Sequence, residues 1–291
     1  MKMWLGASFS DTDQFVELAR AAERCGFDTL TLSDHLFYAD YFGTPYPYSK
    51  SGRPRWNART HWPDVWVTIG AMAAVTTSLR FAPNVYVAPV RDLFTVAKQV
   101  STAAVLSRDR VTFGVGVGWC KEEFVATGQD FHTRGRRLDA MLPVLRSLWA
   151  GETVTLDGLP ALSISPVPAG RIPVHVGGDS EAALRRAARL GDGWIGNRIY
   201  TEEQLDPVLD TLRRHLDANG RSGQPFDIIA PLAVLPDAGT YRRFAAKGVT
   251  GTLAAPWWLA TPEEKARYGE DTLELKIATM ERFAEEVIAK L

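Results

Sequence analysis

The sequence predicts an α/β protein built as a (β/α)8 barrel, or TIM barrel, with inserted segments. Short apolar segments alternate eight times with longer amphipathic ones, which is the pattern of parallel strands joined by right-handed helical crossovers. The 291 residues suit one such barrel, and no linker, low-complexity tract or charge block divides them. We therefore predict a single domain over residues 1–291. A doubly wound open sheet with a helical tail is the alternative that the same pattern allows.

The first four units are predicted from strand alternation and from residues that start or stop helices. Threonine alternates with leucine in FDTLTL, which favours a strand. Gly26 stops the helix before it, and Pro63 with Asp64 is typical of a helix start. In chain order we expect strand 3–9 with helix 11–24, strand 27–32 with helix 63–77, strand 80–87 with helix 93–106, and strand 110–117 with helix 134–150.

The last four units follow the same logic. Ser180 caps one helix, and Gly191 ends it. We expect strand 172–176 with helix 180–190, strand 193–196 with helix 202–218, strand 226–235 with helix 239–247, and strand 249–254 with helix from 262 to the C-terminus. Residues 36–62 and 151–171 are longer than ordinary connections and are interpreted as insertions. The second insertion contains VTLDG, which favours a small hairpin.

Composition and charge exclude several classes of partner. The formal net charge of −1 gives no reason to expect nucleic acid or an acidic membrane. Cys25 and Cys120 are too few for a disulfide framework and are expected to be free thiols. The N-terminal stretch has no secretory core, and no apolar run reaches the length of a membrane span. We expect a cytoplasmic protein.

The stretch RVTFGVGVGWCKEEF alternates glycine and valine from Gly114 to Gly118. It fails the dinucleotide fingerprint because Trp119 stands where the third glycine is required, and no Gly-Lys-Ser/Thr follows to make a phosphate-binding loop. In a barrel, Gly116 and Gly118 lie at the carboxyl end of strand four, the rim where barrels build active sites. Two interpretations stay open: close approach of a flat ligand, or a bulge that shapes the barrel.

Two other strand ends carry residues that suit chemistry. Asp34 and His35 follow strand two as an acid and an imidazole, although such a pair also serves as a helix cap with a bonded histidine. Gly177 and Gly178 precede a helix start, where backbone N–H groups favour an anion; a tight turn with an ordinary serine cap is the alternative. The five histidines are scattered without metal-site spacing, and His175 lies inside a strand. A lone Cys120 without a base is expected to be unreactive.

Together these segments resemble the bacterial luciferase-like monooxygenase superfamily, and more closely its branch that uses the deazaflavin coenzyme F420. The matching stretches cover most of the first 200 residues and read LTLSDHL, RFAPNVYVAPVRDLFTVAKQV, RVTFGVGVGWCKEEFVATG, RGRRLDAMLPVLRSLWAG and IPVHVGGDSEAALRRAARLGDGWIG. The resemblance implies a luciferase-like TIM barrel with a flavin-like ring at the rim.

The resemblance also assigns roles to residues. His35 would donate or accept a proton, with Asp34 beside it near the ring. Asn84-Val85 would form the bulge with a non-proline cis peptide against the ring. The other expected cofactor contacts are Val117, Gly118 and Trp119 at the ring or ribityl chain, Glu122 at the ring, Gly177 and Gly178 at the phosphate, and Arg198 at the oligoglutamate tail. One departure stands out: some relatives have a catalytic carboxylate at the position that Trp119 occupies.

The activity that the resemblance implies is hydride transfer between F420 and a small organic substrate, at carbon 5 of the deazaflavin. FMN is the alternative cofactor and would permit monooxygenation through nitrogen 5. A flavin-binding protein without turnover is an alternative of another class, which the Asp34-His35 pair argues against. A barrel hydrolase or aldolase lacks a strand-end lysine or paired carboxylates. Segment 36–62 is either a lid or a dimer arm, and family members commonly form homodimers.

Overall fold

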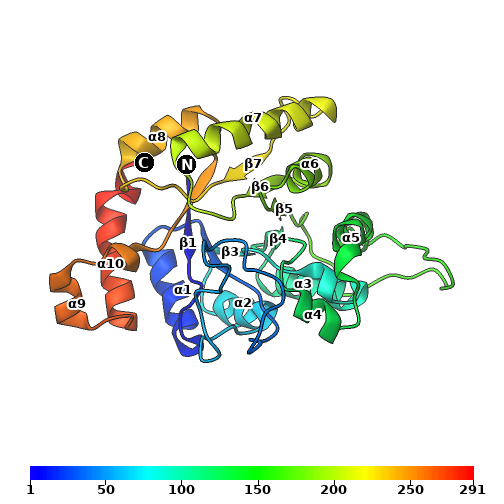
Figure 1. Cartoon of the computed structure of the whole chain (residues 1–291), viewed down its shortest axis with the longest axis horizontal. Helices are drawn as coiled ribbons and strands as arrows, with labels where there is room; N and C mark the ends of the chain where they lie inside the picture. The colour runs from blue at the N-terminus through cyan, green and yellow to red at the C-terminus, as the bar shows by residue number, and fades with distance from the viewer.

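The computed structural model describes residues 1–291 and contains eight parallel strands (Figure 1). They are β1 (Lys2–Gly6), β2 (Thr29–Leu32), β3 (Arg80–Pro83), β4 (Phe113–Val115), β5 (Val174–Gly177), β6 (Gly193–Ile195), β7 (Asp227–Ile229) and β8 (Gly251–Ala254). Their order is β3-β2-β1-β8-β7-β6-β5-β4, so each strand lies beside its sequence neighbour and β1 pairs with β8.

The sheet closes between β3 and β4. Parallel bridges join Phe81 to Val111 and Tyr86 to Val115 across this seam. The Phe81 N–H donates to Arg110 O at 2.8 Å, and the Tyr86 N–H donates to Gly114 O at 2.9 Å. The predicted TIM barrel is therefore confirmed, and the open-sheet alternative is wrong.

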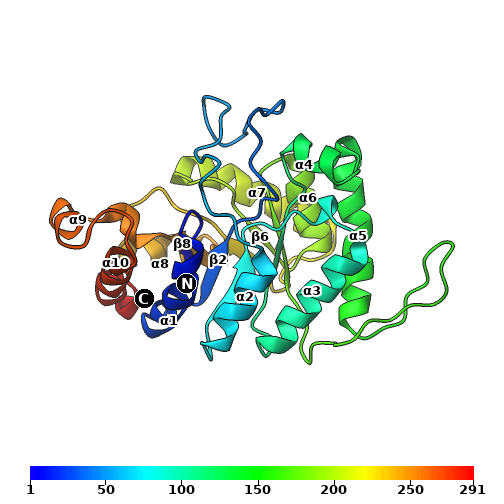
Figure 2. The ribbon, with the colours of Figure 1, turned by 90° about the horizontal axis from the view of Figure 1, so that it is seen from below.

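Ten α-helices surround the strands (Figures 1 and 2). They are α1 (Phe15–Arg24), α2 (Val65–Ala74), α3 (Leu93–Leu106), α4 (Lys121–Ala126), α5 (Arg134–Trp149), α6 (Glu181–Leu190), α7 (Glu202–Ala218), α8 (Ala238–Ala246), α9 (Pro262–Tyr268) and α10 (Leu273–Glu286). Their starts are fixed by side-chain caps of the expected type: Asp64, Asp92, Ser180 and Thr201 accept backbone N–H groups at α2, α3, α6 and α7.

Two helical regions differ from the sequence prediction. The loop expected after strand four contains the short helix α4. The single C-terminal helix is instead two, α9 and α10, because Gly269 (φ 86°) and Asp271 (φ 58°) take left-handed backbone conformations between them. The short helix α4 matters most for the site, since it begins at the rim.

The core has two parts. The larger contains 54 buried residues from strands and helices, which pack the outer face of the barrel against its helical coat. Trp4, Ala82, Ile195 and Ile229 form a smaller cluster; because they come from four strands, they meet inside the barrel. His175 lies inside β5, as expected, and its buried ring stacks on Trp4 at 5.8 Å.

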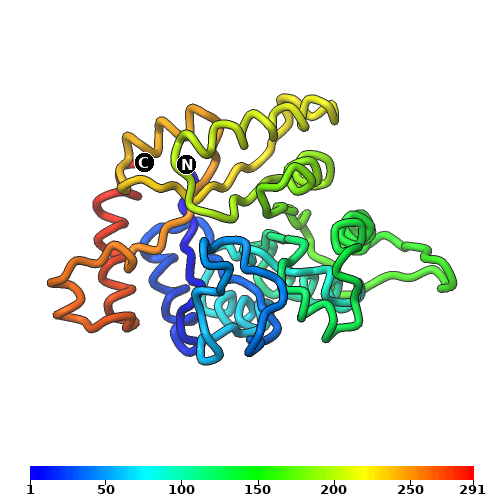
Figure 3. Tube along the Cα trace, viewed as in Figure 1, coloured from blue at the N-terminus to red at the C-terminus, as the bar shows by residue number.

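Both inserted segments are present as expected. Residues 36–62 form no helix or strand and stand off one end of the barrel in Figure 2. Residues 151–171 project as a long loop in Figure 3, and an antiparallel bridge between Val154 and Leu162 confirms the small hairpin. None of the helices combines the length and the apolar character needed to cross a membrane.

Candidate functional site

Gly114 of β4, and Gly116 and Gly118 just after it, face the chain that continues β3 toward the rim. A Cβ on Gly116 would lie 2.5 Å from Val85 Cγ2, and a Cβ on Gly118 would lie 2.6 Å from Val87 Cγ1. One on Gly114 would overlap the backbone oxygen of Pro83. The alternation of glycine therefore matches the alternation of residues 83, 85 and 87. Of the two interpretations left open by the sequence, these contacts favour shaping of the barrel.

Val85 lies at the centre of this packing. The Asn84-Val85 peptide bond is cis, as the family resemblance implied. Gly177 of β5 also faces Val85, because a Cβ there would lie 2.6 Å from Val85 Cγ1. Asn84 and Val85 are half-buried, whereas the strand residues before them are buried or nearly so. We call Val85, with Gly116 and Gly177 against it, the Val85 platform.

Hydrogen bonds tie the first three strand ends to this platform. The Ser33 hydroxyl donates to Asn84 O at 3.0 Å, and Ser8 Oγ lies 2.8 Å from Ser33 Oγ. The Asn84 N–H donates to Leu32 O at 2.8 Å. The ends of β1, β2 and β3 are thereby held in one fixed arrangement.

His35 pairs with Glu123 of α4. His35 Nδ1 lies 2.9 Å from Glu123 Oε1, which also accepts the Leu36 N–H at 2.9 Å. The Glu123 side chain is 2% exposed and that of His35 is 10% exposed. A carboxylate at Nδ1 makes that nitrogen the donor and leaves Nε2 to exchange a proton with a ligand. Sequence reasoning missed Glu123.

Glu122, which the sequence placed at the ring, contacts a different partner. Its Oε1 accepts the Gly43 N–H of the inserted segment at 2.6 Å, so it binds segment 36–62 to α4. Its contact with a cofactor stays a prediction. Cys120 directly precedes α4 and is buried; burial and the nearby Glu123 and Glu122 raise the pKa of its thiol to about 12. This agrees with the expectation that Cys120 is unreactive.

Asp34 is fully engaged within the protein. Arg91 donates to both of its oxygens, at 2.7 and 2.8 Å, and the Val87 N–H donates to Oδ2 at 2.9 Å. Asp34 is 6% exposed. The burial of this bidentate pair fixes the segment after β3 against the end of β2. These contacts favour a positioning role for Asp34 over direct proton transfer.

Aromatic side chains cover His35. The rings of Trp56 and Trp62 each lie 4.9 Å from its imidazole, and Trp119 lies at 5.8 Å. We call the surrounding rings the aromatic cluster; its members are Phe9, Phe42, Tyr46, Trp56, Trp62 and Trp119. Four of these six come from segment 36–62.

Segment 36–62 is anchored on opposite sides of the rim. Besides the Gly43–Glu122 bond, Asn197 Nδ2 after β6 donates to Tyr48 Oη at 3.1 Å. The segment thus reaches from unit two across to units four and six. This span favours the lid interpretation over the dimer arm.

The Gly177–Gly178 turn leads directly into α6. Gly178 has a φ of 117°, and a Cβ there would meet Ala183 at 3.0 Å, so only glycine suits this position. The N–H groups of Asp179 and Ser180 find no acceptor in the protein. Free N–H groups at the N-terminus of a ten-residue helix suit a phosphate. Arg198 reaches this turn by an ion pair with Asp179.

The structure therefore brings most of the expected residues to one rim. Val117, Gly118, Trp119, Gly177 and Gly178 are all half-buried at the carboxyl ends of neighbouring strands. A buried indole N–H of Trp62, within the aromatic cluster, has no partner in the protein. An unpaired donor, the half-buried Val85 platform and free helix N–H groups together fit a flat cofactor with a phosphate. No group of three side chains suits a metal ion.

Comparison with known proteins gives a consistent picture. Residues 3–271 match the family model described as luciferase-like monooxygenase. An uncharacterised protein of Mycobacterium tuberculosis is 32% identical over 299 residues, covering 100% of both chains. The F420-dependent glucose-6-phosphate dehydrogenase of M. tuberculosis is 32% identical over 209 residues, which are 67% of this chain and 57% of that protein. The F420-dependent tetrahydromethanopterin reductase of Methanopyrus kandleri has the same fold, with a TM-score of 0.70, 14% identity, and 99% and 98% of the two chains covered.

Proposed function

The chain belongs to the luciferase-like monooxygenase family, and we propose that it is an F420-dependent oxidoreductase that transfers a hydride between the deazaflavin and a small organic substrate. The observation that supports this most directly is the His35–Glu123 pair, 2.9 Å apart and nearly buried. Interconversion of an alcohol and a ketone moves a proton together with each hydride, and a histidine oriented by a carboxylate is suited to that task. The sequence similarity to an F420-dependent dehydrogenase supports the choice of coenzyme.

Different residues at the rim would hold different parts of the cofactor. The Val85 platform and Trp119 would contact the ring, and the Gly177–Gly178 turn with the first N–H groups of α6 would hold the phosphate. Arg198, already beside that turn through Asp179, would meet part of the acidic tail. When bound, F420 would supply a hydride carrier that reacts poorly with oxygen.

The remaining residues act on the substrate side. Glu123 holds the His35 ring so that Nε2 is the atom that donates or accepts the substrate proton. Arg91 and Asp34 keep the segment from residue 84 to 87 in place. Segment 36–62, through the aromatic cluster, would exclude water from the space above His35.

Titration of the purified protein with F420 and with FMN, followed by calorimetry and by the fluorescence of the cofactor ring, tests this proposal. We expect F420 to bind at least tenfold more tightly, a difference of about 1.4 kcal/mol. Preference for FMN would instead favour a monooxygenase, to be tested with oxygen and a flavin reductase. Binding of neither cofactor would contradict the assignment of the rim.

The His35→Asn variant tests the catalytic assignment separately. We expect its F420 affinity to stay within a factor of about 3 while turnover falls about 10²- to 10⁴-fold, the usual contribution of a general acid or base. His132→Asn is a matched control, because His132 is exposed in the short 3-10 helix Phe131–Thr133. Unchanged turnover in His35→Asn would remove His35 from the mechanism.

A further inference from the structure

The turn that leads into α6 carries a carboxylate beside the N–H groups that are free to bind an anion. The N–H groups of Asp179 and Ser180 have no acceptor in the protein, and Asp179 also supplies the carboxylate. The bonds of an aspartate keep its carboxyl carbon within about 4 Å of its own backbone nitrogen. A phosphate oxygen that accepts the Asp179 N–H at an ordinary distance therefore lies within about 7 Å of that negative charge.

Two side chains from the segment after β6 hold the Asp179 carboxylate. Tyr200 Oη donates to Oδ1, and Arg198 Nε forms an ion pair with Oδ2. The Asp179 side chain is 13% exposed, whereas that of Arg198 is 56% exposed. Burial and the neighbouring carboxylate raise the pKa of Tyr200, so this residue donates as a neutral phenol. Of the two partners, only Arg198 compensates the negative charge of Asp179.

Arg198 is the only cation that contacts this turn. No lysine or other arginine donates to residues 177–180 or forms an ion pair with them. Because Arg198 is paired with Asp179, these two side chains add no net charge, and the attraction for a phosphate comes from the free N–H groups and the dipole of α6. That dipole is equivalent to roughly half an elementary charge, which offsets little of the larger desolvation cost of a doubly charged anion.

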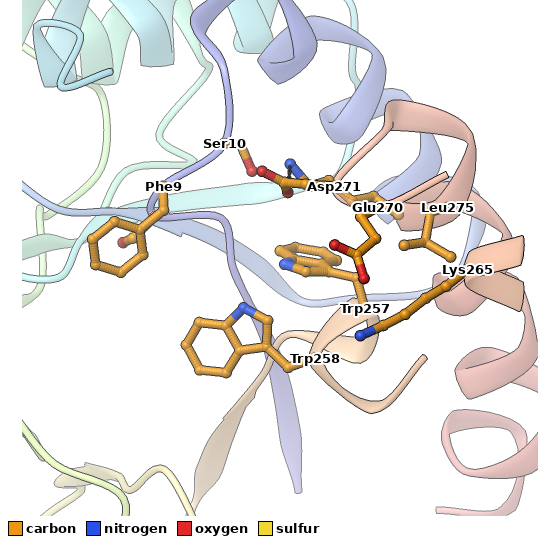
Figure 4. Close-up of a pocket in the computed structure, with 10 residues that line it drawn as sticks. Phe9, Ser10, Trp257, Trp258, Lys265, Glu270, Asp271 and Leu275 are labelled. Atoms are coloured by element: carbon orange, nitrogen blue, oxygen red, sulfur yellow. Dashed lines mark ion pairs between the residues drawn. The ribbon is translucent and has the colours of Figure 1, made fainter. Parts of the chain in front are cut away.

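The cavity between the loops that follow β1 and β8 is less suited to a phosphate (Figure 4). Barrels often bind phosphate near their last strands, and this cavity has a volume of about 440 Å³. However, Glu270 and Asp271 both line it, and Lys276 is already paired with Asp271 at 2.7 Å. Glu270 has no partner in the protein, so a phosphate there would meet an unpaired negative charge. At the turn before α6, the one carboxylate is paired.

We propose that Asp179 makes the turn before α6 selective for a phosphodiester, which carries one negative charge, over a phosphomonoester, which carries nearly two above neutral pH. The second charge of a monoester is repelled by the Asp179 carboxylate and finds no unpaired cation at the turn. F420 is a phosphodiester, since its phosphate joins the ribityl chain to the acidic tail, whereas FMN ends in a phosphomonoester. The inference rests on the proposed function and names a specificity-determining residue of the same site.

Two probes that share a ring and lack the acidic tail test this selectivity in the intact protein. They are 8-hydroxy-5-deazariboflavin 5′-phosphate, which is a monoester, and the methyl ester of that phosphate, which is a diester. Calorimetry at pH 8 gives the dissociation constant of each probe, and the quantity compared between variants is the ratio of the two constants. In the wild type we expect the diester to bind at least about threefold more tightly.

Two variants should move this ratio in opposite directions. Asp179→Asn removes the charge and frees Arg198, while an amide oxygen can still accept from Tyr200; we expect the monoester to gain at least about fivefold more affinity than the diester. Arg198→Gln leaves the Asp179 charge uncompensated and should shift the ratio at least about threefold the other way. A ratio that moves the same way in both variants, or that Asp179→Asn leaves unchanged, would overturn the proposal. Binding of neither probe to the wild type would also overturn it.

Glu181→Gln is the matched control, because it removes one negative charge two residues further along the chain. The Glu181 side chain is 60% exposed, and its Oε1 lies 2.7 Å from His215 Nε2 of α7. We expect the ratio to stay within about twofold of the wild type. A shift as large as that of Asp179→Asn would overturn the proposal, since net charge alone would then explain both.

A parallel titration separates this inference from the proposed function. F420 and FMN are titrated into the wild type, and the comparison of monoester with diester is repeated with FMN and its methyl ester. Tighter binding of FMN than of F420 would reject the proposed function, while the response of the ratio to Asp179→Asn would still decide the role of Asp179. Preference for F420 with an unresponsive ratio would reject the role of Asp179 alone.

Discussion

His35 Nδ1 and Glu123 Oε1 lie 2.9 Å apart although 88 residues separate them in the chain. His35 follows β2, and Glu123 lies on the short helix after β4, so the barrel brings together two units that are not neighbours. The carboxylate also accepts the Leu36 N–H. One buried oxygen thereby fixes both the imidazole and the start of the inserted segment.

Glu123→Gln should reduce turnover roughly 10- to 100-fold while changing F420 affinity little, because the neutral amide makes a weaker hydrogen bond to Nδ1 and holds the imidazole less firmly. The check is kcat alongside the dissociation constant from calorimetry. Glu285→Gln, an exposed residue on α10, is the matched control. Loss of cofactor binding in proportion to turnover would instead assign Glu123 a role in the architecture of the rim.

Gly116→Ala should destabilise the protein by about 1–3 kcal/mol, because the new methyl group would lie 2.5 Å from Val85 Cγ2. Urea unfolding measures this change. Adding Val85→Ala removes the clash and should recover at least half of the lost free energy of unfolding. Gly70→Ala in α2 meets nothing within 4 Å and should be neutral or slightly stabilising. A stable single variant with no recovery in the double variant would contradict the close packing of Val85.

Cys120 should resist alkylation. Burial raises the pKa of its thiol to about 12, so roughly one thiol in ten thousand is ionised at pH 8. Cys25 is only half-buried and should react first. Mass spectrometry of peptides after timed treatment with iodoacetamide checks the order. Faster labelling of Cys120 in the folded protein would show that α4 opens readily.

Glu23 should contribute to stability in a pH-dependent way. Burial acts to raise its pKa, but the N–H groups of Thr77, Ser78 and Leu79 donate to Oε1 and lower the pKa from 4.5 to about 2. The stabilisation is therefore present above pH 4.5 and is lost as the pH falls toward 2.

The variant Glu23→Gln should cost about 1 kcal/mol at pH 7 after allowance for solvent screening. Urea unfolding at several pH values should show its difference from the wild type shrinking over that acid range. Glu17→Gln, an exposed position on the same helix, is the control. A difference that does not vary with pH would rule out the charge as the source.

The expected homodimer stays a prediction. The outward face of α2 presents Val67, Ala71 and Ala74, and the helix has no charged residue. Light scattering after size exclusion should give about 64 kDa, twice the 32.1 kDa of one chain. Val67→Glu should shift this mass toward that of a monomer if α2 lies at the contact. A monomeric wild type would contradict the prediction.

Much of the fold could be predicted because its signals are local. The bounds of α3 and α7 agree with the prediction to the residue, since each has a polar cap and a continuous apolar face. The break before α10 was missed although it carried local signals, since Gly269 ends α9 and Thr272 caps α10. The irregular path of segment 36–62 has no period from which its contacts could be derived.

At the site, the sequence analysis assigned Glu122 to the cofactor ring, whereas in the structure it is the next residue, Glu123, that pairs with His35. Adjacent residues of a helix point about 100° apart, so Glu122 and Glu123 have different partners. A usable signal was present: Cys120, Glu123 and Phe124 are spaced as one buried helical face. A helix of six residues, such as α4, is too short for this periodicity to be recognised from the sequence alone.

The tryptophans of the aromatic cluster also give the protein an intrinsic fluorescence signal that reports on the site. Three of its nine tryptophans, at positions 56, 62 and 119, surround His35. Indole emission depends strongly on neighbouring rings and on acceptors that absorb at the same wavelengths, as a deazaflavin or flavin would. Arrival of a cofactor, or displacement of segment 36–62, should therefore change the intrinsic emission without any added label. Stopped-flow fluorimetry can therefore measure the rates of cofactor binding and of movement of segment 36–62.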